Sequence, residues 1–330
     1  MTAVREDGRA RVVVFDPPLD EEWLLNLAAV IASPDLELVV PSSPEQADEE
    51  ILTADIVIAT GRRRIDRAVI AGLDRAPGIL CLSVGTDQVD LDAANEAGIG
   101  VTNVPDYCTQ DVADHALALL LAAQRRLFPT VQATRSGVWT QHDTDEVNSI
   151  RRLGGQTLGL IGAGRIGRLV ASRARAFGFE TIAHDPGVEA QFDDQVRLVD
   201  LGELAGLSDA VIVCAALTPG SRHIIDHAFF ARARSGLVLV NVARAGLVDE
   251  VALAAALDDG TVAVAALDVR EPVSSDHEDP LSARANVIIT PHLAGTSIEA
   301  VDDLMLQAAS LSRAMLTRRG RISRTEGAVQ

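Results

Sequence analysis

The sequence predicts an α/β protein of two domains, each built on a parallel β-sheet. Short apolar, β-branched runs alternate with longer helical patterns along the whole chain, which is typical of consecutive βα units. The chain has 330 residues, of which 48% are hydrophobic. Since a domain commonly holds roughly 100 to 200 residues, we expect two hydrophobic cores.

Apolar runs of strand length fall into two groups along the chain. The first group, which fits one small sheet, is RVVVF at 11–15, LELVV at 36–40, DIVIA at 55–59, ILCLS at 79–83 and VTNV at 101–104. The second group predicts a doubly wound sheet of six strands: TLGLIG at 157–162, ETIAH at 180–184, AVIVC at 210–214, LVLVN at 237–241, VAVAALD at 262–268 and NVIIT at 286–290.

Two helical stretches frame the second group. The helix expected at 112–128 is apolar nearly all round, so we expect burial on several sides, as at a domain or subunit interface. The helix expected at 297–316 has no strand after it and should return to the first domain. The segment 136–152 has no clear periodicity and is interpreted as a loop.

A glycine-rich turn joins the strand at 157–162 to the helix that follows it. Gly162 permits the tight turn, Gly164 permits close approach of a pyrophosphate, and Gly167 permits close packing of helix and strand. The free N–H groups at the helix start would bind the anion, with Arg165 and Ile166 beside it. Such a turn alone is weak evidence, because a glycine-rich connection can also be merely structural.

Asp185 strengthens the prediction of a dinucleotide site, because it ends the next strand 18 residues after Gly167. A carboxylate there accepts both ribose hydroxyls and repels a 2'-phosphate, which favours NAD over NADP. The alternative is an ordinary turn aspartate before Pro186.

Polar residues follow three strands of the same predicted sheet, where open parallel sheets bind ligands. They are Arg244, then Asp268 with Glu271, then His292 after Pro291. Arginine binds a carboxylate in bidentate fashion and can polarise a carbonyl, while histidine can exchange a proton near neutral pH. Each residue alone is more often a salt-bridge partner or a loop residue, so the prediction of a catalytic site rests on their combination with the glycine turn.

Composition excludes several functions. A formal charge of -18 repels phosphate backbones and anionic lipid, so we expect neither nucleic acid nor membrane partners. The chain has no lysine, which excludes Schiff-base catalysis and lysine-dependent phosphate loops. Its three cysteines have no CxxC spacing, and we expect them to be reduced, without a metal site, in a cytoplasmic protein that has no signal or spanning segment.

The motifs together resemble the D-isomer-specific 2-hydroxyacid dehydrogenase family over nearly the whole chain. The similar blocks are SVGTDQVDLDAANEAGIGVTNVPD, LGGQTLGLIGAGRIGRLVASRARAFGFETIAHDP, LTPGSRHIID, NVARAGLVDE, ALDVREP and ITPHLAG, in the order of the family. The resemblance implies a flavodoxin-like substrate domain, 1–108 plus 299–330, into which a Rossmann NAD domain, 109–298, is inserted. It also implies a homodimer formed through the NAD domains.

The resemblance assigns further site residues. Val84 and Gly85 would offer backbone N–H groups to the substrate carboxylate alongside Arg244, and Asp268 would face the nicotinamide carboxamide. The cofactor cleft would be lined by Ala215, Thr218, Val242 and Ala243. Cys108 falls where related proteins place a small residue near the cofactor phosphates.

Two positions depart from the family pattern. Val273 stands where the family has its catalytic glutamate, so Glu271 replaces it only if the loop is re-routed; Asp276, Glu278 and Asp279 are other candidates. Without a carboxylate partner, the pKa of His292 would fall toward or below its reference value of about 6.5. Ala245 replaces a usual glycine, and its methyl group would crowd a bulky substrate.

The favoured interpretation is an NAD-dependent oxidoreductase that interconverts a small 2-oxo acid and its D-2-hydroxy acid, similar to glyoxylate/hydroxypyruvate reductases and phosphoglycerate dehydrogenases. The alternative is an NAD(H)-binding regulatory protein resembling the C-terminal-binding corepressors, with little or no turnover. Arg62, Arg63 and Arg64 follow a strand of the first domain and could bind a second anionic group of a substrate, although a solvated basic turn is the more common arrangement.

Overall fold

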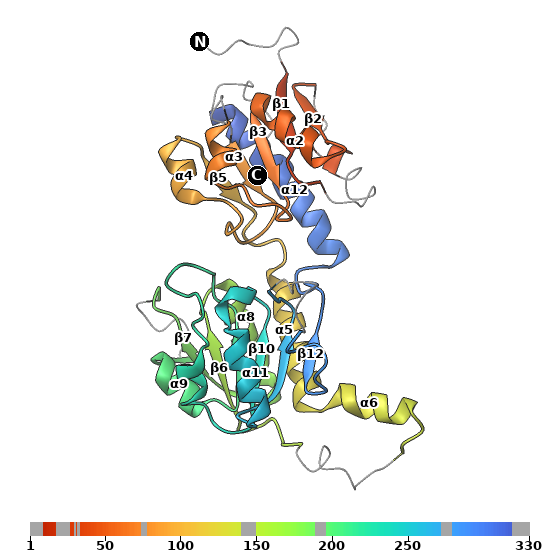
Figure 1. Ribbon diagram of the computed structural model, residues 1–330, viewed down its shortest axis with the longest axis vertical. Helices are drawn as coiled ribbons and strands as arrows, with labels where there is room; N and C mark the ends of the chain where they lie inside the picture. Colours follow the sequence, from red (N-terminus) through yellow and green to blue (C-terminus); the bar gives the residue numbers. More distant parts are fainter. Residues whose placement is uncertain are drawn as a thin grey trace. The chain divides into compact units, whose positions relative to one another are not determined.

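The computed structural model describes residues 9–17, 27–29, 31, 34–73, 78–139, 150–188, 196–271 and 279–318. The chain divides into two compact units (Figure 1). Unit 1 comprises Met1–Tyr107 and Ser297–Gln330, and unit 2 comprises Cys108–Thr296. All strand pairings in both sheets are parallel, so the α/β class predicted from the alternating pattern is confirmed.

Unit 1 holds a five-stranded sheet of order β2-β1-β3-β4-β5, the flavodoxin-like order. Its strands are β1 (Ala10–Val14), β2 (Leu36–Val39), β3 (Ile56–Ala59), β4 (Gly78–Cys81) and β5 (Val101–Asn103). Its helices are α2 (Pro44–Glu50), the 3-10 turn η1 (Ile51–Thr53), α3 (Arg67–Ala71), α4 (Leu91–Glu96) and α12 (Ile298–Arg318). Each of β1, β3 and β4 is buried throughout, as expected for central parallel strands.

Helix α12 brings the C-terminal part of the chain back to this sheet. Its apolar residues Leu304, Met305 and Ala308 join one hydrophobic core with residues of β1 and β3. The helix passes so close to β4 that a Cβ on Gly78 would lie only 2.3 Å from the Met315 methyl group. A larger residue at this position would therefore displace the end of the Met315 side chain.

Unit 2 holds a seven-stranded sheet of order β12-β11-β10-β9-β6-β7-β8. Its strands are β6 (Thr157–Ile161), β7 (Glu180–His184), β8 (Val196–Leu198), β9 (Ala210–Val213), β10 (Leu237–Asn241), β11 (Val262–Leu267) and β12 (Val287–Ile289). Its helices are α5 (Thr109–Gln124), α6 (Leu127–Arg135), α8 (Arg165–Ala174), α9 (Leu201–Leu207), α10 (His227–Phe230) and α11 (Glu250–Asp258), with 3-10 turns η2 (Arg175–Phe177) and η3 (Ala245–Leu247).

The six strands expected for this sheet are present, but the sheet has a seventh strand, β8, so the expected number was wrong. Strand β8 pairs with β7 at the sheet edge and has only three residues, one of which is Arg197. A three-residue edge strand with a charged middle residue gives no hydrophobic pattern. The strand order reverses direction between β6 and β9, which places the glycine turn after β6 at the switch point of the doubly wound sheet.

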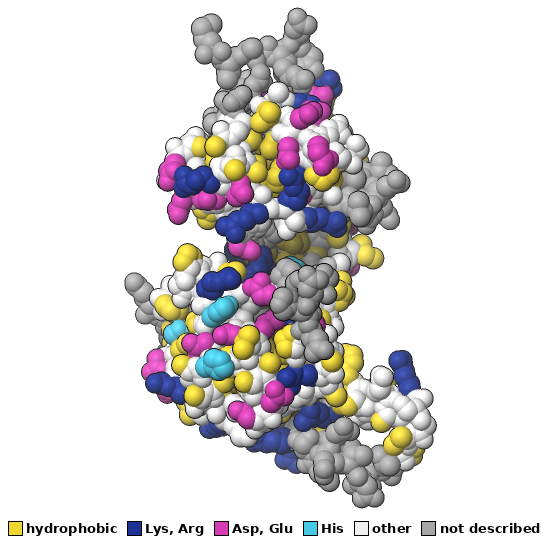
Figure 2. Space-filling view, viewed as in Figure 1, with side chains coloured by type: hydrophobic (Ala, Val, Ile, Leu, Met, Phe, Trp, Pro, Cys, Tyr) yellow, Lys and Arg dark blue, Asp and Glu magenta, His cyan; other side chains and the backbone are white. Residues whose placement is uncertain are grey.

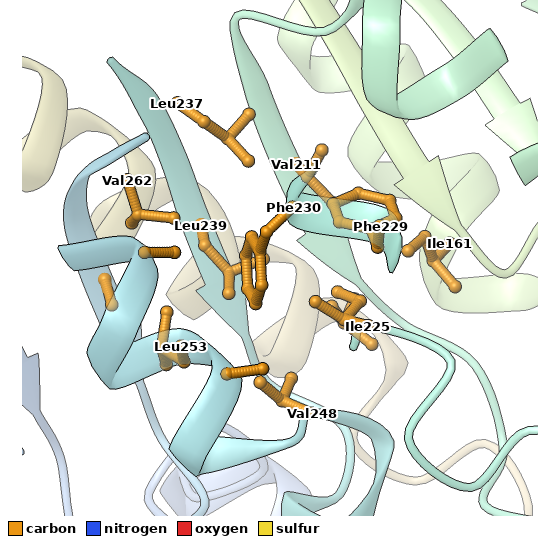
Figure 3. Packing of buried hydrophobic residues seen from close by; sticks show 14 of the residues in the cluster. Ile161, Val211, Ile225, Phe229, Phe230, Leu237, Leu239, Val248, Leu253 and Val262 are labelled. Atoms are coloured by element: carbon orange, nitrogen blue, oxygen red, sulfur yellow. The ribbon is translucent and has the colours of Figure 1, made fainter. Parts of the chain in front are cut away.

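The main core of unit 2 lies between the sheet and helices α9, α10 and α11 (Figure 3). Phe229 and Phe230 of α10 point into it beside Leu239 of β10, and the two rings meet edge to face at 5.8 Å. Helix α5 packs against α8, β10 and β11, in line with the expected burial on several sides. It ends at Gln124, earlier than expected, because Arg126 adopts a left-handed conformation with φ 52° before α6 begins.

Candidate active site

The glycine turn after β6 has the geometry that a dinucleotide phosphate site requires. Gly162 has φ 100°, and a Cβ there would lie 2.7 Å from the backbone nitrogen of Ala215. A Cβ on Gly167 would lie 2.2 Å from the carbonyl oxygen of Gly162, so helix α8 packs directly on the turn. Gly164, at the start of α8, has open space within 4 Å of the position a Cβ would take. The turn therefore fits a pyrophosphate placed at the N-terminus of α8.

Asp185 follows β7, and its carboxylate forms hydrogen bonds both with the glycine turn and with the turn that Asp185 itself begins. Its Oδ2 accepts a hydrogen bond from the N–H of Ala163 at 2.8 Å, and its Oδ1 accepts one from Gly187 at 2.9 Å. The hydrogen bond from Gly187 is typical of an ordinary turn aspartate, which was the alternative role for Asp185. The hydrogen bond from Ala163 instead connects Asp185 to the glycine turn. Its partly exposed carboxylate thus lies at the edge of the predicted phosphate site, where the ribose would bind.

The other residues expected to line the cofactor cleft lie in loops at the carboxyl ends of the strands. Ala215 and Thr218 follow β9, and the amide and hydroxyl of Thr218 form hydrogen bonds with Ser221 that close the loop. Val242 and Ala243 follow β10 and are almost fully buried. Arg165 is exposed and Ile166 is half-buried in the first turn of α8.

A cavity of about 500 Å³ opens at the same ends of β10, β11 and β12. Arg244, Ala245 and His292 are among the residues that line it. The three strand ends from which the sequence predicted a convergence of polar residues therefore meet at one cavity. Its size suits a small organic acid together with part of a cofactor.

Arg244 is positioned by the end of β10. The buried Asn241 donates a hydrogen bond from its side-chain amide to the carbonyl oxygen of Arg244 at 2.9 Å and accepts one from the N–H of Ala243 at 3.0 Å. The guanidinium Nη1 donates to the carbonyl oxygen of Ala243 at 2.8 Å. These bonds fix the loop backbone, and the half-buried guanidinium lines the cavity.

His292 has a strained backbone, with φ 57° in the left-handed region. A non-glycine residue there is held by its surroundings, since the conformation costs about 1 kcal/mol or more. The N–H of His292 lies 2.9 Å from the carbonyl oxygen of Asp268 and 3.0 Å from that of Thr290. Its exposed side chain lines the cavity.

Asp268 anchors the loop that carries His292. Its side chain is fully buried and accepts hydrogen bonds from the N–H groups of Leu293 at 2.8 Å and Ala294 at 2.9 Å, and from the Thr290 hydroxyl at 2.5 Å. The resemblance assigned this carboxylate to the nicotinamide. The nicotinamide contact stays a prediction, and in the structure both oxygens of Asp268 hold the loop around His292.

Glu271 lies beside a different loop. Its Oε1 would be 3.4 Å from a Cβ on Gly246, close to Arg222, and Glu271 is not among the described residues that line the cavity. Asp279 does line it, but forms an ion pair with Arg270 at 2.8 Å. Val273, Asp276 and Glu278 lie outside the described residues.

Arg270 binds two carboxylates at the cavity wall, an arrangement that has no signal in the local sequence pattern. It donates to Glu250 at 2.7 Å as well as to Asp279, and all three side chains are mostly buried. Burial opposes the charge of Arg270, but these hydrogen bonds outweigh it and raise its pKa. The hydrogen bond from Arg270 holds the pKa of Asp279 well below its usual range. The network therefore stays charged at neutral pH.

The predicted substrate residues of unit 1 lie in the loop after β4. The carbonyl oxygen of Val84 accepts a hydrogen bond from Asn103 at 2.6 Å, and that of Gly85 accepts one from Ser83 at 2.7 Å. After β3, the carboxylate of Asp16 accepts hydrogen bonds from the backbone N–H groups of Arg62 and Arg63. Arg63 itself forms an ion pair with Asp48 and stacks on Phe15, whereas Arg62 and Arg64 are exposed.

A sequence model of the D-isomer specific 2-hydroxyacid dehydrogenase NAD binding domain matches residues 117–294, more than half of the chain. The chain belongs to this family. The match falls within unit 2, which is therefore the NAD-binding domain, and NAD is its cofactor. The family predicted from the sequence motifs is confirmed.

Among curated relatives, the D-3-phosphoglycerate dehydrogenase of Methanocaldococcus jannaschii is 36% identical over 293 residues, which are 88% of this chain and 54% of that protein. The chain thus spans about half the length of the phosphoglycerate dehydrogenases it matches. The hydroxypyruvate reductase of Thermotoga maritima is 34% identical and is matched over 94% of its length and 89% of this chain.

Solved structures agree with the fold. The D-lactate dehydrogenase of Aquifex aeolicus, complexed with NAD and lactic acid, has a TM-score of 0.82 at 25% identity, covering 94% of this chain and 97% of the other. The two-domain α/β fold, with a Rossmann domain inserted, is therefore shared with known dehydrogenases. Within the described residues, no helix is both long and apolar enough to cross a membrane, and no group of three metal-binding side chains occurs.

Proposed function

We propose that this D-2-hydroxyacid dehydrogenase interconverts a small 2-oxo acid and its D-2-hydroxy acid with NAD(H). The observation that carries the proposal is the 500 Å³ cavity at the carboxyl ends of β10, β11 and β12, lined by both Arg244 and His292. A guanidinium and an imidazole at one cavity of an NAD-binding domain match the two needs of the reaction, carboxylate binding and proton transfer.

The glycine turn would hold NAD(H), which would supply or accept the hydride at the substrate carbon. Asp185 would bind the ribose hydroxyls, since its carboxylate lies at the turn, and it would repel a 2'-phosphate. Gly164 leaves room for the pyrophosphate at the start of α8, with Arg165 and Ile166 beside it, while Gly162 and Gly167 permit the tight turn and the close packing of α8 on it. Ala215, Thr218, Val242 and Ala243 would line the remainder of the cofactor cleft.

Arg244 would bind the substrate carboxylate with its planar guanidinium and polarise the neighbouring carbonyl. In reduction, His292 donates a proton to the carbonyl oxygen while that carbon gains the hydride; in oxidation, it takes the hydroxyl proton back. The N–H groups of Val84 and Gly85 in unit 1 are the proposed second contact to the carboxylate. Unit 1 would then be the substrate domain, about 1–108 plus 299–330.

Proton donation by His292 requires a nearby group that supports its charged form. Glu271 stays the candidate that the sequence offers, although its Oε1 lies beside Gly246. Because this oxygen lies near Arg222 instead of the cavity, we expect Glu271 to contribute little to proton transfer. The pH dependence of kcat/KM in Glu271→Gln tests its role.

Ala245 supports a small substrate, because it lines the cavity next to Arg244. Its methyl group reduces the space that a glycine would leave there. We therefore propose short 2-oxo acids of two or three carbons, such as glyoxylate, pyruvate and hydroxypyruvate, over branched ones.

The test is NADH oxidation by the purified chain against glyoxylate, hydroxypyruvate, pyruvate, oxaloacetate and branched 2-oxo acids, measured from pH 5 to pH 9. We expect turnover with at least one short acid, and a higher kcat/KM with NADH than with NADPH. Tight NADH binding without turnover of any acid at any pH would overturn the proposal and favour a regulatory NAD(H)-binding protein.

We also propose that the chain forms a homodimer through unit 2. Large apolar side chains are exposed on and just after α6, which extends away from the rest of this unit (Figure 1). They are Leu127, Phe128, Val131, Val138 and Trp139, with exposed fractions between 46% and 78%. Hydrophobic atoms are visible on this projecting segment in Figure 2. A cluster of this kind on a soluble domain marks a protein interface.

A further inference from the structure

A histidine on helix α5 contacts the loop that carries His292. His115 Nε2 lies 3.1 Å from the hydroxyl oxygen of Thr290 and 3.4 Å from Oδ1 of Asp268. Thr290 and Asp268 are 175 and 153 positions away in the sequence, so only the fold brings the three together. His115 is half-buried, with 23% of its side chain exposed, while the side chain of Asp268 is fully buried.

The hydrogen bonds define where the protons lie. The Thr290 hydroxyl has one proton and lies 2.5 Å from Oδ1 of Asp268, a carboxylate that can only accept. The hydroxyl therefore donates to Asp268, and its oxygen accepts from His115. Nε2 of His115 must then carry a proton, whether the ring is neutral or charged.

The same carboxylate maintains the strained conformation of His292. The side-chain carboxylate of Asp268 accepts hydrogen bonds from the N–H groups of Leu293 and Ala294, the two residues that follow His292. The main-chain carbonyl oxygen of Asp268 accepts a hydrogen bond from the N–H of His292. A shift of the Asp268 side chain would release these bonds together. The left-handed backbone of His292 would then be free to relax, since such a conformation persists only where the surroundings hold it.

We propose that His115 is a positioning residue for catalysis: its Nε2–H holds Thr290 and Asp268 in the arrangement that keeps His292 in place at the cavity. The inference rests on the proposed function, because His292 is its proton donor. His115 itself does not line the cavity among the described residues, so its effect passes through Thr290 and Asp268.

The substitutions His115→Leu and His115→Gln test the proposal. Leucine removes the donor, whereas the glutamine amide can place a donor near the position of Nε2. We expect kcat for the best 2-oxo acid to fall at least tenfold in His115→Leu, with the dissociation constant of NADH changed less than twofold. His115→Gln should recover most of the loss. Asp114→Asn, at an exposed position of the same helix as His115, removes an ion pair with Arg173 of α8 and should keep the wild-type kcat.

A double-variant cycle separates positioning from general damage to α5. If His115 acts through Thr290, then His115→Leu combined with Thr290→Val should lower kcat by no more than the more severe single variant. Multiplied losses, an equal loss in His115→Gln, or a parallel loss of NADH affinity would overturn the proposal.

A spectroscopic measurement works even if no 2-oxo acid is turned over. In protein labelled with ¹⁵N-histidine, long-range ¹H–¹⁵N spectra identify which ring nitrogen carries the proton, and the His115 signal is assigned by its loss in His115→Gln. We expect a protonated Nε2 at neutral pH, and a shifted His292 signal in His115→Leu. A neutral ring protonated only at Nδ1 would overturn this inference, while absent turnover alone would count only against the proposed function.

Discussion

Gly162, Gly164 and Gly167 each have the steric surroundings that a dinucleotide-binding turn requires. Gly162 and Gly167 have no room for a Cβ, whereas Gly164 has open space where a phosphate would approach. These three different environments match the three roles assigned from the motif. The positions of the residues around His292 depend instead on contacts between segments that are distant in the sequence. Substitutions near His292 therefore test the proposed mechanism most directly.

Glu271→Gln tests whether that carboxylate supports the proton donor. Because its Oε1 lies beside Gly246 and near Arg222, we expect kcat to change less than threefold. The pH dependence of kcat/KM should keep its midpoint. The measurement is kcat/KM for the best 2-oxo acid between pH 5 and pH 9. A midpoint lowered by about one pH unit or more would show that Glu271 raises the pKa of His292 after all.

Ala245→Gly tests the predicted limit on substrate size. Removal of the methyl group next to Arg244 enlarges the cavity, so kcat/KM for a branched 2-oxo acid should rise severalfold relative to that for glyoxylate. One methylene in a pocket is worth roughly 1–3 kcal/mol in discrimination. An unchanged ratio between the two acids would mean that Ala245 does not limit the substrate. Ala254, a half-buried alanine of α11 outside the cavity, supplies the matched control as Ala254→Gly.

At the scale of elements, the strand ends position the site and a charged network supports its wall. Glu250 at the start of α11, Arg270 after β11 and Asp279 before β12 join three segments through ion pairs. Since the folded-state pKa of Asp279 lies below its unfolded value, the stabilisation by this group is complete above about pH 4 and is lost as pH falls toward the folded-state pKa.

Asp279→Asn should therefore lower the free energy of unfolding by about 1 kcal/mol at pH 7 and by less at pH 3. Urea unfolding of both proteins at the two pH values measures this difference. Glu96→Gln is the matched control, because the pair of Glu96 with Arg67 is exposed and should contribute little at either pH. A difference between wild type and Asp279→Asn that grows toward acid pH would contradict the assignment.

The strands and helix ends that could be predicted have a recognisable pattern in the local sequence, and those that could not be predicted have none. The strands β6, β9, β10 and β11 are largely buried and consist of continuous apolar runs. Such runs can be recognised in the sequence without any alternation of apolar and polar residues. Strand β8 is too short to show a hydrophobic pattern. The break between α5 and α6 depends on the left-handed backbone of Arg126, and arginine is not a residue type that signals the end of a helix. Contacts such as His115 with Thr290 leave no local signal at all.

At the scale of the whole molecule, the predicted homodimer depends on the exposed apolar residues around α6. Light scattering after gel filtration should give about twice the chain mass of 34.9 kDa. Phe128→Glu combined with Val131→Glu should shift the protein toward the monomer, because buried charges at an interface are unfavourable. Leu306→Glu, on the exposed face of α12 in unit 1, should leave the mass unchanged. A monomeric wild type, or a dimer unaffected by the double variant, would contradict this interface.

We propose that His292 transfers a proton during reduction of a 2-oxo acid by NADH held at the glycine turn. Its most direct test is a single turnover of wild type and His292→Ala, with the NADH signal and the chirality of the product measured together. We expect the D-2-hydroxy acid from the wild type. In His292→Ala, the rate should fall at least a hundredfold while the dissociation constant of NADH changes less than twofold. Full activity in His292→Ala, or an L-2-hydroxy acid as product, would contradict the account.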